Sequence, residues 1–370
     1  MSAPLSTRAL GRALLARQML LARADVDVVT AVRRLAGMQA QVAPPLFVGL
    51  WSRLLRVTPD DLVARVMDRS LVRGTLMRGT LHLVTADDLV AFRPTLGPTL
   101  LRSLAGTLGA RLGDLDLDAV VAHARALYAT GPRAFDRLRV ELAQRFPDAD
   151  ERAPGYAVRM ALPLVQVPEG APWGWSAKAE FTPADDWLGR EVPASTDDPA
   201  AARALVLRYL AAFGPASVKD AQAWSGMGGL APAFEALRPE LVVFRDARKR
   251  ELFDLPDAPR PPEDTPAPVR LVAAFDNLIL SHDDRTRIVP EAARPRLATK
   301  NLLIPATVLV DGLVDGTWTW KATKKAAELT VVPFSRWTKA TAREVEAEGH
   351  ALLAMVAPGL APRVTTQAAT

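Results

Sequence analysis

Two stretches of the sequence share one plan, in which a helical pattern stops at Gly-Pro and a second helical pattern follows a short polar step. They are residues 119–147 (AVVAHARALYATGPRAFDRLRVELAQRFP) and residues 201–227 (AARALVLRYLAAFGPASVKDAQAWSGM). Glycine commonly follows the last turn of a helix, and proline cannot continue one. Ser217 is well placed to cap the second helix of the second stretch. Each stretch is therefore predicted to be a pair of helices joined by a tight turn.

A pair of strand-like segments follows each helical pair. The first is LPLVQVPEGAPWGWSAKAEFTP, with a turn at Glu169–Gly170, and the second is ELVVFRDARKRELFDLP, with a turn at 246–249. Two helices followed by a hairpin are the layout of a winged helix. Two unrelated helical hairpins remain the alternative interpretation.

The N-terminal residues fit the same plan less closely. Helical patterns cover about 5–23 and 27–40, and Thr58 can cap a further helix. In residues 70–88 (SLVRGTLMRGTLHLVTADD), β-branched and other apolar residues alternate with polar ones, as in a strand. The two Arg-Gly-Thr steps of this stretch suggest a hairpin. A further winged unit is therefore predicted at the start of the chain.

The C-terminal part has a different character. Residues 256–268 (PDAPRPPEDTPAP) have the composition of an extended linker, and the residues after them are rich in strand patterns. Asp315–Gly316 indicates a hairpin turn, and a last helix is predicted at roughly 338–357. The predicted α+β fold thus comprises winged helices at 1–95, 96–190 and 195–256, a Pro-rich linker at 257–268, a β-rich subdomain at 269–360 and a flexible tail at 361–370.

Composition excludes several classes of protein. The chain of 370 residues has no cysteine, so it has no disulfide, thiolate metal site or cysteine nucleophile. Its four histidines are scattered without metal-ligand spacing, and no dinucleotide, Walker or GxSxG motif occurs, so we predict neither a metal nor a cofactor. No apolar run approaches the ~20 residues of a membrane span. Arginines are dispersed through the N-terminal apolar positions, which favours an amphipathic helix over a signal peptide. We therefore expect a cytoplasmic bacterial protein.

Basic residues outnumber acidic ones, 46 to 41, and most of them are arginine. The planar guanidinium of arginine, with its several N–H donors, suits contact with DNA phosphates. Such contacts do not depend on the base sequence of the DNA. A solvated surface charge is the alternative for each residue. The candidate contacts are Arg53, Arg73, Arg78, Arg285, Arg287, Lys321, Lys324 and Lys325.

Three stretches taken in order resemble the AlkZ-like family of bacterial DNA glycosylases. They are residues 31–54 (AVRRLAGMQAQVAPPLFVGLWSRL), 71–89 (LVRGTLMRGTLHLVTADDL) and 275–289 (FDNLILSHDDRTRIV). The resemblance extends from residue 5 to about 357. It implies three tandem winged helices and a β-rich C-terminal part that form a C-shaped DNA-binding channel.

The resemblance also implies a catalytic motif, Gln–apolar–Gln, which Gln39–Ala40–Gln41 matches. A sister branch of the family carries Gln–apolar–Asp, so this chain is expected on the antibiotic self-resistance side. Without the resemblance, two glutamines after a helix would be interpreted as helix-end hydrogen bonding. His82 is a candidate helper that contacts phosphate or sugar, with a packed histidine as the alternative.

The implied function is a monofunctional, monomeric glycosylase that acts on double-stranded DNA with bulky N7-alkylguanine adducts, interstrand crosslinks being a further possible substrate. Alkylation at N7 makes the base a cationic leaving group, so a strong general base is less needed. Two amides can hold the water and contact sugar or phosphate oxygens. The competing hypothesis is a non-catalytic winged-helix protein, either a transcription regulator or an adduct binder.

Overall fold

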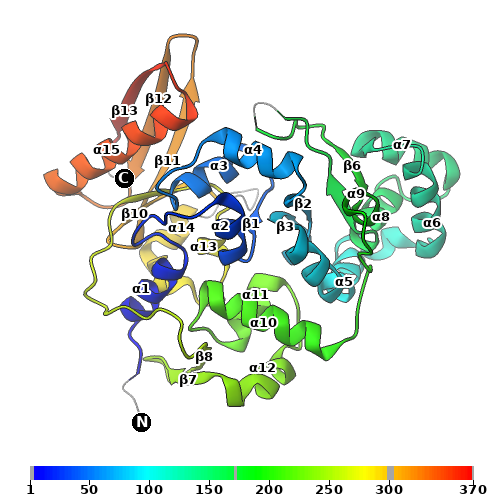
Figure 1. The fold of residues 1–370 in the computed structure, drawn as a ribbon, viewed down its shortest axis with the longest axis horizontal. Coiled ribbons are helices and arrows are strands. Elements are labelled where there is room, and N and C mark those ends of the chain that lie inside the picture. Colours follow the sequence, from blue (N-terminus) through cyan, green and yellow to red (C-terminus); the bar gives the residue numbers. More distant parts are fainter. Residues whose placement is uncertain (1–3, 171–172, 298–303, 369–370) are drawn as a thin grey trace.

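Residues 28–85 lie in the middle of the molecule (Figure 1). In this computed structural model, residues 4–170, 173–297 and 304–368 are described. The N-terminal elements are α1 (Thr7–Arg17), α2 (Val28–Arg34), β1 (Met38–Gln39), α3 (Pro44–Trp51), α4 (Pro59–Met67), β2 (Leu71–Thr75) and β3 (Leu81–Thr85). Thr58 caps α4 in a reciprocal capping box with Asp61, which confirms the predicted helix start. The hairpin predicted at 70–88 is also present, as β2 and β3.

The next residues extend the same sheet and cover it with helices. They form α5 (Ala86–Leu108), α6 (Leu117–Tyr128), β4 (Arg133–Ala134), α7 (Phe135–Arg145), α8 (Ala153–Ala161), β5 (Leu164–Gln166), β6 (Glu180–Pro183) and α9 (Ala184–Leu188). The antiparallel sheet has the order β1-β3-β2-β5-β6-β4. Helix α5 runs across the boundary predicted at 95/96. The first two predicted units are therefore joined by a common sheet and a continuous helix.

The segment predicted as the next winged helix lies along another side of the central region (Figure 1). It contains α10 (Pro199–Phe213), α11 (Val218–Ser225), α12 (Ala231–Leu237) and an antiparallel hairpin of β7 (Val242–Arg245) and β8 (Glu251–Asp254). Ser217 caps α11 as predicted, again in a capping box. Gly214 and Pro215 separate α10 from α11. The elements follow the predicted order, with α12 added before the hairpin.

The Pro-rich segment at 257–268 is irregular but anchored to α1. Arg12 donates from Nε to the carbonyl of Thr265 at 2.6 Å, and Arg8 donates from Nε to the carbonyl of Glu263 at 2.8 Å. These contacts tie the start of the C-terminal part to the first helix of the chain.

The C-terminal part is a five-stranded sheet covered by one long helix. Its elements are β9 (Arg270–Val272), α13 (Asn277–Leu280), α14 (Arg294–Leu297), β10 (Thr307–Val310), β11 (Leu313–Ala322), β12 (Ala326–Pro333), α15 (Lys339–Val356) and β13 (Ala361–Thr366). The sheet order is β13-β12-β11-β10-β9. Thr338 caps α15, which confirms the predicted last helix.

Two predictions for this part are wrong. The hairpin turn lies at Asp311–Gly312, both with positive φ (46° and 79°), whereas Asp315–Gly316 lies inside β11. The same two-residue signal occurs twice within six residues, and pairing of β10 with β11 selects the first. The flexible tail predicted from residue 361 is wrong for residues 361–366, which form β13. This strand pairs in parallel with β12 and covers the edge of β12.

Helix α3 links the N-terminal and C-terminal cores. Leu46 and Leu50 pack into the core beneath β1, whereas Val48 and Trp51 pack into the core of the C-terminal sheet. The segment from β1 to α3 therefore lies where these two cores meet. Within the described part of the chain, no helix has the length and apolar character needed to cross a membrane.

Candidate active site

The Gln–Ala–Gln motif begins in a short strand, not in a helix. The helix predicted over 27–40 is wrong beyond Arg34, because Ala36 and Gly37 adopt positive φ (51° and 92°) and turn the chain into β1. Gly37 is needed there, since a Cβ atom would lie 2.7 Å from Cγ1 of Val84. Gln39 then pairs with His82 of β3.

The backbone of the motif is held by β3 and by Arg73 of β2. The N–H of Ala40 donates to the carbonyl of Leu81 at 2.7 Å. Arg73 donates from Nε to the carbonyl of Ala40 at 2.8 Å and from Nη2 to that of Gln41 at 3.2 Å. Burial, and then the charge of Arg159, lower the pKa of Arg73 to about 10, so it stays protonated at neutral pH. Arg73 is only 4% exposed. The expectation that it contacts DNA is therefore corrected: it shapes the motif instead.

Both glutamine side chains have their carbonyl oxygens occupied by protein donors. Oε1 of the half-buried Gln39 accepts from Nη2 of Arg78 at 2.8 Å. Oε1 of the exposed Gln41 accepts from the backbone N–H of Leu81 at 3.2 Å. The amide nitrogens have no recorded partner in the part of the chain that the structure describes. The arrangement leaves donors available to a substrate.

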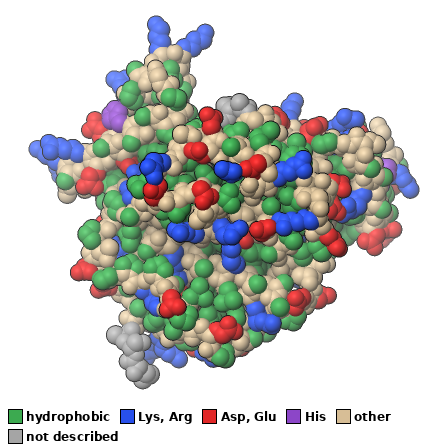
Figure 2. Space-filling view, viewed as in Figure 1, with side chains coloured by type: hydrophobic (Ala, Val, Ile, Leu, Met, Phe, Trp, Pro, Cys, Tyr) green, Lys and Arg blue, Asp and Glu red, His purple; other side chains and the backbone are tan. Residues whose placement is uncertain are grey.

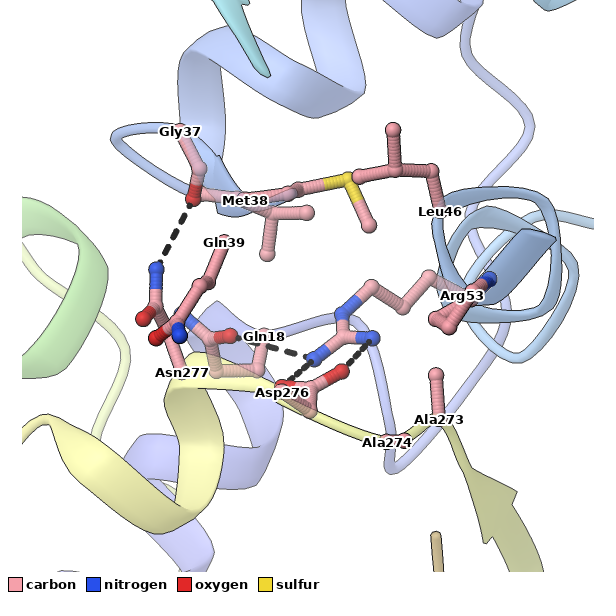
Figure 3. Close-up of a pocket in the computed structure, with 12 residues that line it drawn as sticks. Gln18, Gly37, Met38, Gln39, Leu46, Arg53, Ala273, Ala274, Asp276 and Asn277 are labelled. Carbon is pink, nitrogen blue, oxygen red and sulfur yellow. Dashed lines mark hydrogen bonds and ion pairs between the residues drawn. The ribbon is translucent and has the colours of Figure 1, made fainter. Parts of the chain in front are cut away.

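Arg78 connects Gln39 to two distant segments. Its guanidinium also donates to Oδ1 of Asn277 at 3.1 Å and to the backbone carbonyl of Trp224. Asn277, which follows β9, donates from Nδ2 to the carbonyl of Gly37 at 3.3 Å (Figure 3). Burial, followed by the charge of Arg285, lowers the pKa of Arg78 to about 10. Arg78 thus organises the site, and because its side chain is only half-buried, its contact with DNA stays a prediction.

Arg53 and Asp276 form a buried ion pair beside Gln39 (Figure 3). Two guanidinium nitrogens of Arg53 meet the two carboxylate oxygens of Asp276, each at 2.8 Å, and Arg53 is 1% exposed. This placement corrects the expectation that Arg53 contacts DNA, because its guanidinium is buried and a phosphate cannot reach it. The pair fastens the segment after β9 to the turn that follows α3, and so sets the position of Asn277.

Three site residues were missed by sequence reasoning. Gln18, Asp276 and Asn277 line the small pocket around Gln39 together with Arg53 (Figure 3). A signal was present for two of them, since Asp276 and Asn277 directly follow Phe275, the first residue of the third stretch of the family resemblance. Gln18 carried no such signal, and only the packing of α1 against the site reveals it.

His82 is buried and uncharged. It is 0% exposed, its Nδ1 donates to the carbonyl of Thr80 at 3.1 Å, and its Nε2 has no hydrogen-bond partner. Burial, and then the nearby charge of Arg78, lower the pKa of His82 to about 3. The expectation that it contacts phosphate or sugar is corrected, because the side chain has no exposed surface.

The lowered pKa of His82 predicts a pH dependence of stability. The unfolded chain binds a proton at this residue below about pH 6.5 and the folded protein does so only near pH 3, so stability is full above 6.5 and falls as the pH drops between these values. His82→Asn is expected to flatten this decline by up to about 1.4 kcal/mol per pH unit in urea titrations at a series of pH values. His350→Asn, at a side chain 42% exposed, is the control. An identical slope in wild type and His82→Asn would contradict the prediction.

The remaining predicted DNA contacts fall into two groups. Arg287 is 2% exposed and donates to the carbonyl of Pro215 at 2.8 Å, which corrects its prediction as a DNA contact. Arg285 is exposed, and basic side chains stand at the tip of the β11–β12 hairpin (Figure 2). That tip carries Lys321, Lys324 and Lys325, all exposed, with Lys321 3.1 Å from Glu328. These four residues stay predicted contacts.

An apolar hollow of about 440 Å³ lies beside the motif. Pro44 and Pro45, which open α3, form one wall, and Trp318 and Trp320 of β11 form another. Trp318 is buried and donates from Nε1 to the carbonyl of Val272 at 3.1 Å, whereas Trp320 is partly exposed. The hollow shares Pro45, Ala273 and Ala274 with the pocket around Gln39.

Comparison with known proteins identifies this arrangement. A sequence profile described as "DNA glycosylase AlkZ-like" matches residues 32–355. A relative from Streptomyces sahachiroi, described as an interstrand DNA cross-link repair glycosylase, is 26% identical over 363 residues, which cover 90% of this chain and 91% of the relative. The solved structure of the Streptomyces sahachiroi DNA glycosylase AlkZ has the same fold, with a TM-score of 0.80 at 21% identity over 99% of this chain and 100% of that one.

The class of protein is therefore an enzyme, a DNA glycosylase of mixed α+β fold. The chain belongs to the AlkZ-like family. Membership of this family favours a glycosylase over the alternative considered from the sequence, a winged-helix protein that binds DNA without catalysis. The three winged units and the C-shaped channel stay predictions.

Proposed function

We propose that this glycosylase hydrolyses the N-glycosidic bond of guanines with bulky N7-alkyl adducts in double-stranded DNA, including interstrand crosslinks, made by an alkylating natural product. Such an activity would protect a producing cell from its own product. The observation that supports the proposal most strongly is a site of amides: Gln39 and Gln41 present N–H donors, while the carboxylate beside them, Asp276, is held by Arg53.

The chemistry of a cationic base explains why amides suffice. As the bond from C1′ to N9 breaks, its electron pair moves to the base and neutralises the charge created by alkylation. Water then adds to C1′ of the oxocarbenium-like sugar and loses a proton to solvent. Positioning and electrostatic stabilisation are the main requirements, and proton transfer to the base is not needed.

We propose hydrolysis alone, without a lyase reaction that cleaves the strand, because a lyase reaction would need an amine nucleophile. The first lysine of the chain is Lys178, far along the sequence from the motif. We propose further that the protein acts as a monomer and that Arg285, Lys321, Lys324 and Lys325 contact DNA phosphates.

The hollow beside the motif supports a bulky adduct as substrate. Its volume of about 440 Å³ falls within the range of small-molecule sites, and its lining by proline, tryptophan and aliphatic side chains suits a flat apolar group. Because it adjoins the pocket of Gln39, a group attached to the guanine could occupy it while the glycosidic bond faces the motif.

The test uses two duplexes, one with a single bulky aromatic N7-alkylguanine and one with a single N7-methylguanine. Each is incubated with protein and then treated with alkali, which cleaves abasic sites. We expect strand breaks with the bulky adduct, and a shifted but uncleaved band would contradict the proposed function.

Trp320→Ala tests the hollow. We expect it to slow excision of the bulky adduct about fivefold, since loss of one aromatic contact costs on the order of 1 kcal/mol, and to leave any excision of N7-methylguanine unchanged. Trp187→Ala, on α9, serves as the matched control. Equal rates for Trp320→Ala and wild type on the bulky adduct would show that the hollow does not receive it.

A further inference from the structure

The orientation of the Gln39 amide is fixed by chemistry. A guanidinium has donors only, so the atom of Gln39 that faces Arg78 at 2.8 Å must be the carbonyl oxygen. The amide NH2 group then points away from Arg78. No hydrogen bond is recorded for it within the described ranges, and the side chain is partly exposed at the pocket.

The orientation of Arg78 is fixed as well. Its other partners are the carbonyl of Trp224 and Oδ1 of Asn277, and Asn277 is itself oriented because its Nδ2 donates to the carbonyl of Gly37. Arg78 adopts a positive φ of 56°, and Gly226 packs so closely that a Cβ there would lie 3.1 Å from Cα of Arg78. The guanidinium therefore cannot turn without moving three segments of the chain.

We propose that Arg78 is a positioning residue that fixes Gln39 as a hydrogen-bond donor toward an acceptor on the lesioned nucleotide. The acceptor is an oxygen or ring nitrogen of the base, or a neighbouring phosphate oxygen. The inference rests on the proposed function and makes it specific: Gln39 stabilises the nucleotide by donating a hydrogen bond, and does not accept a hydrogen bond from the attacking water.

Two physical reasons favour a donor at this position. As the glycosidic bond breaks, electron density rises on the acceptor atoms of the departing base, so a hydrogen bond to them strengthens in the transition state. Donation by Arg78 to Oε1 also polarises the amide, which makes its N–H groups stronger donors. For Gln39 to accept from water instead, its oxygen would have to leave Arg78.

Gln39→Glu tests the polarity of this hydrogen bond. A carboxylate keeps the contact with Arg78 and has the same length, but it has no N–H to donate. With enzyme in excess over a duplex carrying a bulky N7-alkylguanine, we expect the single-turnover rate to fall about 100-fold. The dissociation constant for the same duplex, measured in parallel, separates this loss from weaker DNA binding. A rate within threefold of wild type would overturn the inference.

Arg78 variants test whether that residue acts through Gln39. Arg78→Met is expected to slow the reaction about 50-fold in the wild-type background but less than threefold in the Gln39→Glu background, because its effect passes through the amide. Arg78→Lys keeps a donor and is expected to recover part of the rate, which keeps the test open if Arg78→Met does not fold. Independent, multiplicative losses would overturn the positioning role.

Arg93→Lys is the matched control for replacing a buried arginine. Arg93 is 1% exposed and donates to the carbonyls of Ala194 and Met160, away from the motif, so its loss should affect stability but not the single-turnover rate. The two proposals fail differently. If wild type releases no base, the proposed function fails; if wild type is active and Gln39→Glu equals it, only the inference fails.

Discussion

Replacing Gln39 and Gln41 together by alanine is expected to lower the single-turnover rate of base release about 1000-fold while DNA binding changes by no more than a few-fold. Protein donors occupy both amide oxygens, so in the proposed mechanism each amide offers its N–H groups to the substrate. Loss of one such preorganised donor typically costs about 10² to 10³ in rate. The two losses are not expected to multiply, because both side chains act on one reaction centre. The rate is measured with enzyme in excess and the affinity by titration of the same adducted duplex.

Binding should survive this double substitution because the backbone of the motif is held independently of the side chains. Ala40 bonds to Leu81, and Arg73 donates to the carbonyls of Ala40 and Gln41. Gln144→Ala, at an exposed amide on α7, is the control and should leave both rate and affinity unchanged. A double variant that releases the base as fast as wild type would remove the two glutamines from the mechanism.

Arg53→Met is expected to lower the free energy of unfolding by about 3–5 kcal/mol. The substitution leaves the carboxylate of Asp276 without its partner at a position where both side chains are almost fully buried (1% and 5% exposed). Urea titration followed by circular dichroism measures the change. Asp276 also orders the residues that orient Gln39, so base release at saturating enzyme should fall as well.

An exposed ion pair in the same region provides the control for that stability change. Arg56 and Asp25 lie 2.7 Å apart with side chains 80% and 60% exposed, so Arg56→Met should cost less than about 1 kcal/mol. Equal losses for Arg53→Met and Arg56→Met would contradict the view that the pair of Arg53 and Asp276 fastens the C-terminal part to the site.

Local patterns in the sequence predicted local structure well. Thr58 and Ser217 begin helices where their side chains can cap exposed N–H groups, and the hairpin of β2 and β3 follows from alternation of its residues. The turn at Asp311–Gly312 shows the limit of such signals. Two Asp-Gly steps compete within a few residues, and the pairing of β10 with β11 decides between them.

Contacts between distant segments were beyond prediction from these patterns. Residues 361–366 form a strand because they pair with the edge of β12. Their own sequence does not show that this edge is available. Composition likewise cannot tell a solvated arginine from a buried one. Three arginines predicted to contact DNA instead donate hydrogen bonds inside the protein. Arg53 donates to a carboxylate, and Arg73 and Arg287 donate to backbone carbonyls.

The candidate site combines both kinds of information. The resemblance to the family indicated Gln39 and Gln41, whereas the residues that orient them come from elsewhere in the chain. Arg78 reaches Gln39 from the β2–β3 turn, and Asn277 reaches Arg78 from beyond β9. The residues of these segments carry no direct sign that they lie next to each other in the fold, although both Arg78 and Asn277 belong to the stretches that resemble the family.

The most direct test of catalysis by the amide pair is mass spectrometry of the base released from a duplex with a single bulky N7-alkylguanine. Wild type and the Gln39→Ala/Gln41→Ala variant are compared at saturating enzyme. We predict that wild type releases the intact alkylated guanine in the same molar amount as the abasic sites formed, and that the variant releases almost none. Release by the variant at the wild-type rate, or an adduct that stays in the strand with wild type, would contradict this mechanism.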